Sequence, residues 1–401
     1  MLWWKYEAYS LCEKVFQFKL CYDKERGLKM KEEKHLNKEI NIEDETLNQL
    51  NNLAKELTKK NIPSEFLEEM MKKYLENNSY QNLPRNNSVK VLKKWEVISI
   101  VLDFYKSLDD ELYKRVFNIV MNVNPKIRFN IYDIEDARGF RQRDFEDKKF
   151  RRYELNPYNV KHENRDMVYV PLKSQPEGHV KLEKDTATLA DAYIMVHELA
   201  HTFDMYLNYI LDNKGKNIKN IEKNNILTES TAIAFEKLFT RYLFEKDIID
   251  DYEYVRNILI KRTNHTYIQC EKSYGRLKMI NIMQRNKEIT NKDIKEILSP
   301  LNLIPIQENK YIELLIKEGA KMFDISIGYA MAGMISPTIE KNIMDGNKKN
   351  VKEYLEFSKI MDFEKALNAL GISMDENGIE KLQSNKKEAS WNIKREEKEG
   401  R

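Results

Sequence analysis

The sequence predicts a mainly helical protein with a small antiparallel β-sheet, and three observations lead to this fold class. The chain has 401 residues but only 12 Gly and 9 Pro, so turns are few and the elements between them are long. Apolar residues recur at helical spacing over most of the chain. Alternation of apolar and polar residues, which is typical of strands, is confined to residues 128–183.

Residues 1–125 are predicted to form an N-terminal helical region. Its first clear helix is indicated by the helical spacing of Leu47, Leu50, Leu53, Ala54 and Leu57. A second helix, SEFLEEMMKKYLEN, follows an Ile-Pro-Ser break, and the loop QNLPRNNS comes next. Two more helices are predicted in VKVLKKWEVISIVLDFYKSL and DDELYKRVFNIVMN.

The pattern changes after Pro125. IRFNIYDI alternates like a strand, and MVYVPLKSQPEGHVKLEK reads as two extended segments around a Gln-Pro-Glu-Gly turn. A hairpin or small sheet is therefore predicted immediately before the next helix, TLADAYIMVHELAHTFDMYLNYIL. We place the N-terminal cap of that helix at Asp185 or Thr186.

The remainder of the chain returns to helices. The polar loop DNKGKNIKNIEKNN leads into the helix ILTESTAIAFEKLFTRYLFEK. Further helices are predicted in 248–286, 291–298 and 308–345, and VKEYLEFSKIMDFEKALNALG follows. Charged residues without a sustained apolar stripe indicate a frayed tail over 381–401, so the main domain is predicted to span 126–380.

Composition excludes several classes of protein. The 68 Lys and Arg residues nearly balance the 65 Asp and Glu residues, so nothing calls for a nucleic-acid partner. No run approaches the roughly 18 apolar residues of a membrane span. Cys12, Cys21 and Cys270 have no CxxC spacing, which favours a reducing compartment. Because Glu7 and Glu13 interrupt the first segment, we expect no signal peptide and a cytoplasmic location.

One short motif, HELAH at residues 197–201, carries the chemistry of the sequence. His197 and His201 are four residues apart, so on a helix both imidazoles lie on one face and can reach one tetrahedral zinc ion. Glu198 is then placed to act as a general base. The alternative is a helix with two incidental histidines. The extended segments before the helix and its uninterrupted apolar sequence favour the metal site.

A catalytic zinc ion needs a third protein ligand. Glu229, on the next helix, is the candidate, because an αα-hairpin would bring that helix back antiparallel to the first. Glu236 lies seven residues on, along the same face, where a carboxylate can orient a ligand imidazole. The alternatives are an ordinary surface role for Glu229 and His265 as the third ligand.

Three further residues have weaker candidate roles. Asp204 lies on the same face as the histidines and is predicted either to accept the other N–H of a ligand histidine or to be a surface residue. The segment Val180–Leu182 is the candidate edge strand that holds a substrate backbone. His179 beside it is either a substrate-side group or a structural one.

HELAH, followed by Thr-Glu-Ser-Thr with a second glutamate seven residues on, resembles the oligoendopeptidase F and thimet oligopeptidase family of zinc metallopeptidases, which are gluzincins. The resemblance covers about residues 165–375, and the segment FDISIGYAMAGM through YLEFSKIM and LGI is similar to the closing helices of that family. It implies a helical, zincin-like catalytic domain, in which Tyr329 forms a hydrogen bond to the tetrahedral intermediate. The chain would be a shortened and divergent member, since Ala200 replaces a usual glycine and Asp204 a frequent histidine.

The resemblance implies a zinc-dependent metalloendopeptidase that hydrolyses short peptides. One zinc ion per chain would be held by His197, His201 and Glu229, and Glu198 would take a proton from the attacking water. Two other functions stay open. One is a catalytically silent scaffold that binds peptides, which the intact Glu198 disfavours. The other is a gluzincin dedicated to one specific protein substrate.

Overall fold

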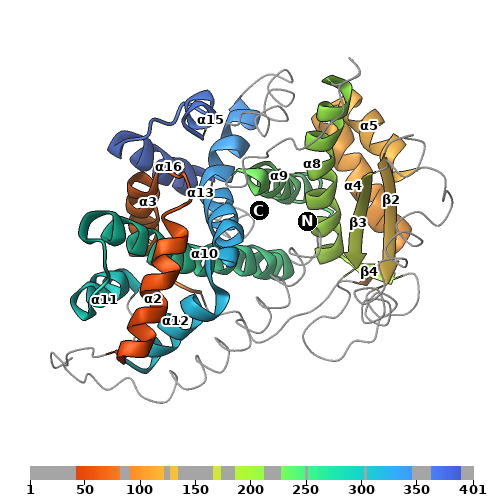
Figure 1. Cartoon of the computed structure of the whole chain (residues 1–401). Coiled ribbons are helices and arrows are strands. Elements are labelled where there is room, and N and C mark those ends of the chain that lie inside the picture. The colour runs from red at the N-terminus through yellow and green to blue at the C-terminus, as the bar shows by residue number, and fades with distance from the viewer. Residues whose placement is uncertain are drawn as a thin grey trace, which may run out of the picture. The chain divides into compact units, whose positions relative to one another are not determined.

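The structure of the protein is a computed structural model (Figure 1). The residues that it describes are 42–81, 91–121, 127–133, 166–172, 186–211, 227–248, 252–301, 305–345 and 363–389. Within these ranges it does not describe the side chains of 127–133, 166–172, 186, 201–211, 228, 252–254, 305–306 and 386–389.

The described part of the chain is mainly helical and contains a small antiparallel sheet, as the sequence predicts. The described strands are β1 (Val91–Lys93), β2 (Ile127–Asp133), β3 (Asp166–Leu172) and β4 (Thr186–Thr188), and they form two separate two-stranded sheets. Its helices are α2 (Asp44–Leu57), α3 (Ser64–Glu76), α4 (Lys94–Leu108), α5 (Asp110–Val120), α8 (Leu189–Leu211), α9 (Thr228–Glu245), α10 (Tyr252–Asn286), α11 (Asn291–Leu298), α12 (Pro305–Glu318), α13 (Phe323–Asp345), α15 (Phe363–Ala369) and α16 (Glu376–Ala389), with 3-10 turns η1 (Ser299–Leu301) and η2 (Ala320–Met322).

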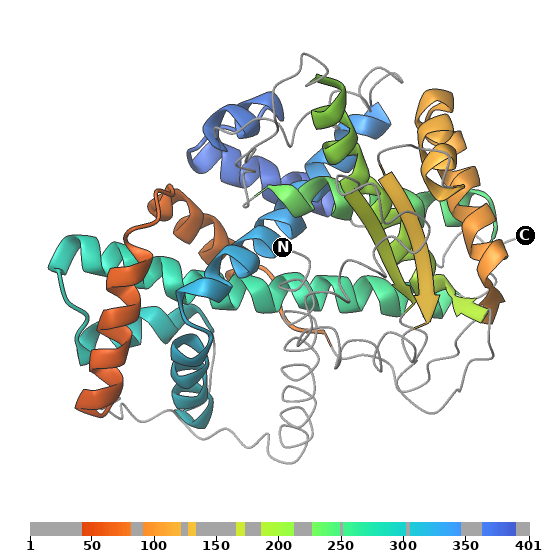
Figure 2. The same ribbon diagram turned by 45° about the vertical axis from the view of Figure 1, so that its right-hand side comes forward.

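The chain divides into two compact units. Unit 1 comprises residues 1–80 and 266–330, and unit 2 comprises 81–265 and 331–401. Helices α10 and α13 each contribute residues to both units. The length of α10 is visible in Figure 2, which shows the ribbon from a second side. This division differs from the predicted boundary at 125, because α4 and α5 belong to unit 2 together with the strands and α8.

Unit 1 buries the apolar stripe that the sequence predicts for α2. Leu50 and Leu57 of this helix are fully buried. Asn51 lies on the same face, where its Nδ2 donates to the carbonyl oxygen of Ile289 (3.0 Å) and its Oδ1 accepts from the N–H of Ile289 (2.7 Å). Because the amide pairs with both backbone groups, α2 is fixed in register against the segment that leads into α11.

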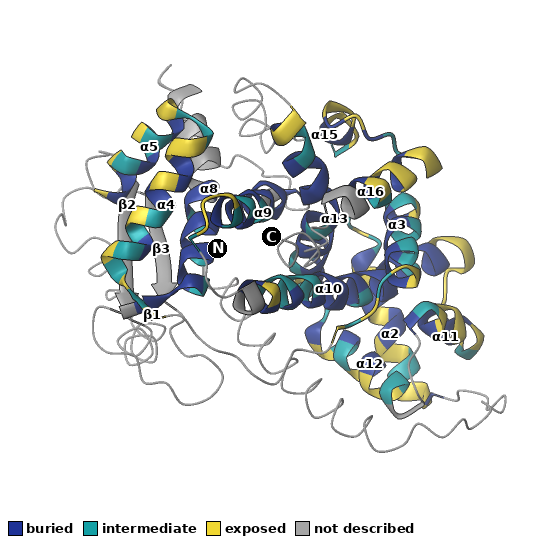
Figure 3. Cartoon of the chain, turned by 180° about the vertical axis from the view of Figure 1, so that it is seen from behind, coloured by how far each residue is buried: buried dark blue, intermediate teal, exposed yellow. Residues whose placement is uncertain are grey.

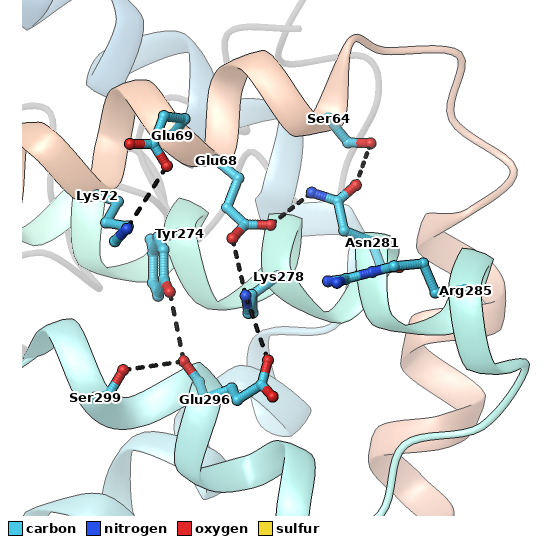
Figure 4. A network of polar contacts seen from close by, with 10 residues as sticks. All are labelled: Ser64, Glu68, Glu69, Lys72, Tyr274, Lys278, Asn281, Arg285, Glu296 and Ser299. Atoms are coloured by element: carbon cyan, nitrogen blue, oxygen red, sulfur yellow. Dashed lines mark hydrogen bonds and ion pairs between the residues drawn. The ribbon is translucent and has the colours of Figure 1, made fainter.

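A polar network ties α3, α10 and α11 of unit 1 together (Figure 4). Glu68 of α3 accepts from Asn281 Nδ2 at 2.6 Å and lies 3.1 Å from Lys278 Nζ. Lys278 also reaches Glu296 of α11 at 3.5 Å, and Ser64 donates to Asn281 Oδ1 at 2.6 Å. The network joins α10 to the next helix of the chain, α11, and to α3, which is distant in sequence.

The interior of unit 1 also holds a cluster of three charged side chains that contact one another. Glu318, at the end of α12, accepts from Lys272 and from Arg276 of α10, the latter at 2.9 Å. The side chains of Glu318 and Arg276 have no exposed surface, and that of Lys272 is only 4% exposed. Because two cations share one carboxylate away from water, the stability of this unit depends on the charge of Glu318.

Replacing Glu318 by Gln is expected to lower the free energy of unfolding by about 3–5 kcal/mol, since it leaves two buried cations without a counter-charge. Thermal or urea unfolding of the purified variant measures the effect. Glu313 lies on the same helix but is exposed, so Glu313→Gln is the matched control and should change stability little. Equal stability of the two variants would show that the buried carboxylate does not hold the cations.

The antiparallel sheet of unit 2 consists of β1 and β4, with Val91 opposite Thr188 and Lys93 opposite Thr186. Both strands lie where the sequence analysis predicted helix, so that prediction is wrong for residues 91–93 and 186–188. The reason is tertiary: each strand is three residues long and forms only because the other lies beside it. Along the chain, β1 immediately precedes α4 and β4 immediately precedes α8.

Capping bonds set the points at which these two helices begin. Glu96 accepts from the backbone N–H of Lys93 at 2.6 Å, so α4 begins at Lys94. Asp191 accepts from both the N–H and the hydroxyl of Thr188, at 2.6 and 2.8 Å. The cap of α8 is therefore Thr188, and the predicted cap at Asp185 or Thr186 is wrong.

The predicted strands IRFNIYDI and MVYVPL are present as β2 and β3, but they pair with each other. Ile127 lies opposite Asp166 and Asp133 opposite Leu172, so the two strands are parallel. A parallel pair needs a long connection, and here the residues between 133 and 166 supply it. The second arm of the predicted hairpin, Val180–Leu182, lies outside the described residues.

The C-terminal part of the chain differs from the sequence prediction at two points. The segment 308–345 divides at Gly319, whose φ of +63° ends α12 before η2 and α13. The predicted tail from 381 is helical as far as Ala389, in α16. Leu382 is buried there and Asn385 donates to the hydroxyl of Thr338 at 3.0 Å, so this segment packs against α13.

Buried residues extend along the helices of both units (Figure 3). None of the described helices combines the length and the apolar character that crossing a membrane requires.

Candidate metal centre

Helix α8 carries the HELAH motif through the interior of unit 2. Tyr193, Val196 and Leu199 are buried, and α8 contacts α4, α9 and β3. Tyr105 of α4 donates its hydroxyl to the carbonyl oxygen of Val196 at 2.9 Å. The residue directly before His197 is therefore held by a second helix as well as by its own.

An aromatic cluster fills the space between α4 and α9. Phe104 of α4 contacts the rings of Phe235, Phe239 and Tyr242 with centroid distances of 6.5, 5.2 and 5.7 Å. Tyr193 of α8 packs edge-on against Phe239 at 5.1 Å. Because these large rings are buried on all sides of the contact, they fix the separation of α8 and α9 at the level of the candidate site.

Polar contacts between helices α8 and α9 lie in reversed order along the two helices. Tyr193 OH is 2.9 Å from Thr240 Oγ1, and Thr240 in turn donates to the carbonyl oxygen of Glu236 at 3.0 Å. One turn further along α8, His197 Nδ1 is 2.7 Å from Glu236 Oε1. The reversed order agrees with the predicted return of the second helix.

The two nitrogens of His197 face two different carboxylates. Nδ1 contacts Glu236, and Nε2 lies 3.1 Å from Glu229 Oε2. His197 and Glu229 are each 7% exposed and Glu236 is 3% exposed, so the three groups interact away from water. With Glu236 accepting from Nδ1–H, the lone pair of a neutral imidazole lies on Nε2, toward Glu229.

The electrostatics of this cluster favour a positive charge between the carboxylates. Burial by itself lowers the pKa of His197, but hydrogen bonding of the imidazole N–H groups to Glu229 and Glu236, together with the negative charges of these carboxylates, raises that pKa to about 10. The negative charges of the two carboxylates would stabilise a metal cation between His197 Nε2 and Glu229 in the same way. The arrangement is therefore chemically suited to a divalent metal ion.

The other predicted site residues are placed only in part. Glu198 is on α8 and partly exposed, beside His197. His201 and Asp204 are on α8 as well, but their side chains are outside the described ones, and His179 and Val180 are outside the described residues altogether. Among the side chains that the structure does describe, no group of three His, Cys, Asp or Glu is arranged to hold a metal ion.

Two predicted residues lie on helices that both units share. Tyr329 is buried on the part of α13 that belongs to unit 1, whereas the cluster around His197 belongs to unit 2. His265, the alternative ligand, is the last residue of α10 that belongs to unit 2. The roles suggested for both residues stay predictions.

One contact of the cluster is not predicted from the sequence. Arg262 of α10 places its Nε 2.8 Å from Glu236 Oε2. No motif marks this residue, because it is a single arginine on a long charged helix and its partner is 26 residues away in sequence. Only the packing of α10 against α9 brings the two side chains together.

Comparison with known proteins identifies no family for this chain. No protein-family model matches it, and no curated protein matches it. Among solved structures, the chain resembles a candidate peptidase from Chlamydophila abortus with a TM-score of 0.47 and 13% sequence identity. The match covers 87% of this chain but 55% of that one, so this chain spans about half the length of its structural neighbour. Any proposal of function therefore rests on the candidate site and on the sequence motifs that form it.

Proposed function

We propose that this protein is a zinc-dependent metalloendopeptidase that hydrolyses short peptides. The observation that carries the proposal is the placement of His197 between two buried carboxylates. Its Nε2 lies 3.1 Å from Glu229 Oε2, and its Nδ1 lies 2.7 Å from Glu236 Oε1. Histidines that bind zinc typically use one ring nitrogen for the metal ion and donate the N–H of the other to a carboxylate. Here Nε2, which faces Glu229, is the nitrogen available to the ion, and Glu236 is the carboxylate at Nδ1.

The donor set fits a zinc ion. Two ligands of one tetrahedral zinc, each bonded at about 2.0–2.2 Å, lie roughly 3.3–3.5 Å apart. The 3.1 Å separation of His197 Nε2 and Glu229 Oε2 is close to that value, so a small adjustment of either side chain accommodates the ion. His201, four residues along α8, would complete the set of two histidines and one glutamate that is typical of catalytic zinc sites.

Bound there, zinc would supply the Lewis acid that activates a water molecule and polarises the peptide carbonyl group. Glu198 follows His197 directly and is partly exposed, so a substrate and a water molecule can approach it. In the proposed reaction its carboxylate accepts a proton from the attacking water and then passes it to the nitrogen of the leaving amine. Tyr329 is proposed to donate a hydrogen bond to the oxyanion that develops on the carbonyl.

The nature of the substrate follows from the sequence resemblance. The motifs resemble those of the oligoendopeptidase F and thimet oligopeptidase family, and we propose on this basis that the protein acts on short peptides in the cytoplasm. The segment around His179 and Val180 would pair with the backbone of such a peptide by strand addition. One zinc ion per chain is proposed, without a nucleic-acid or membrane partner.

Cleavage of a mixed library of short peptides, read by mass spectrometry, tests the proposal. Protein loaded with one equivalent of zinc should release products, protein treated with a chelator should not, and reloading should restore cleavage. Bound zinc without any product would instead indicate a catalytically silent peptide-binding scaffold. Cleavage of a single protein, with no action on peptides, would indicate a dedicated protease.

A further inference from the structure

We propose that Arg262 is a positioning residue for the metal ligand His197, an inference that rests on the proposed zinc site. It acts through Glu236, because Arg262 Nε is 2.8 Å from Glu236 Oε2 while Glu236 Oε1 is 2.7 Å from His197 Nδ1. The contacts form one continuous line from α10 through α9 to α8. The far end of that line is His197 Nε2, which faces Glu229.

Geometry supports a positioning role. A carboxylate with one fixed oxygen can still rotate about its terminal bond. Glu236 has both oxygens engaged by partners on two different helices, so the plane of its carboxylate is set. Guanidinium N–H groups are rigid and directional, which an ammonium group is not. The orientation of the His197 ring therefore depends on α10 as well as on the helix that carries it.

Charge supports the same role. The side chains of His197, Glu229 and Glu236 are at most 9% exposed, so two carboxylates flank one imidazole in a buried site. Arg262 is 29% exposed and contributes a permanent positive charge at the solvent side of Glu236. This charge offsets part of the negative charge that the two carboxylates place around His197, and it attracts the carboxylate of Glu236 from the side opposite His197.

Arg241 of α9 is another arginine of unit 2, but its Nε contacts a carboxylate other than Glu236. Arg241 donates its Nε to Glu340 of α13, whose side chain is 2% exposed. Arg241 is thus held by a different carboxylate, and Arg262 is the guanidinium whose Nε contacts Glu236. Replacing Arg262 should therefore loosen the carboxylate of Glu236.

The experiment measures zinc affinity by competition with a chromophoric chelator. It compares the wild type with Arg262→Gln, Arg262→Lys, Glu236→Gln and the double variant Arg262→Gln/Glu236→Gln. Arg262→Gln should weaken zinc binding by roughly 10- to 100-fold, as loss of an outer-shell partner does elsewhere. Arg262→Lys retains the charge without the directional N–H and should recover part of the affinity. The double variant should bind zinc no more weakly than Glu236→Gln alone, because Arg262 acts only through Glu236.

Arg256→Gln is the matched control, since Arg256 is an exposed arginine on the same helix, and its zinc affinity should equal that of the wild type. Unchanged affinity in Arg262→Gln, or losses that add in the double variant, would overturn the role of Arg262 while leaving the zinc site intact. Failure of the wild type itself to bind zinc would overturn the proposed function and this inference with it. Circular dichroism of each variant shows whether it is folded.

Discussion

Replacing Glu198 by Gln is expected to lower the rate of peptide hydrolysis by about 10²–10⁴-fold while zinc stays bound. The amide keeps the size and shape of the side chain but cannot accept a proton from the attacking water. Glu198 is not among the proposed ligands, so the metal content should remain one ion per chain. Steady-state cleavage of a peptide from the library, together with metal analysis of the same samples, measures both effects.

The matched control for this prediction is Glu245→Gln, at an exposed position near the end of α9. That variant should cleave the peptide at the wild-type rate. If Glu198→Gln also retained the wild-type rate, Glu198 would not be the base, and the proposed mechanism would be wrong even if the protein binds zinc.

Removal of the Glu229 carboxylate is expected to weaken zinc binding by more than about 100-fold, which exceeds the usual effect of losing an outer-shell partner. The reason is that Glu229→Ala deletes one of three protein ligands from the proposed site. It also removes the carboxylate that His197 Nε2 faces at 3.1 Å. Chelator competition on the purified variant measures the affinity, and peptide cleavage should fall in parallel.

Glu245→Ala again serves as the control, because it removes a carboxylate from the same helix at an exposed position. Full zinc occupancy of Glu229→Ala at wild-type affinity would exclude Glu229 as a ligand. His265 would then be the next residue to replace, since it is the other candidate that the sequence provides.

Much of the fold could be predicted from the sequence because its helices carry regular apolar stripes. The spacing of Leu50 and Leu57 predicts the buried face of α2, and both are fully buried. The same reasoning missed the packed part of α16, where Leu382 is buried within a segment dominated by Lys, Glu and Asn. Local charge masked a short apolar face whose partner, α13, is distant along the chain.

The strands β1 and β4 could not be predicted because each is three residues long and depends on the other, which lies far away in sequence.

Some polar contacts of the candidate site could be predicted from the sequence, and others could not. The spacing of seven residues between Glu229 and Glu236 predicts one helix face, and the structure places both carboxylates on His197. Arg262 joins them only through tertiary packing, which no local pattern encodes.

The central claim is that His197 and Glu229 share a zinc ion. The most direct measurement is anomalous diffraction at the zinc absorption edge from crystals of the zinc-loaded protein. The account predicts one peak per chain, bonded to His197 Nε2 at about 2.0–2.1 Å and to a carboxylate oxygen of Glu229, with Glu236 still accepting from Nδ1. A peak bonded to neither residue, or no peak in protein that is saturated with zinc, would contradict it.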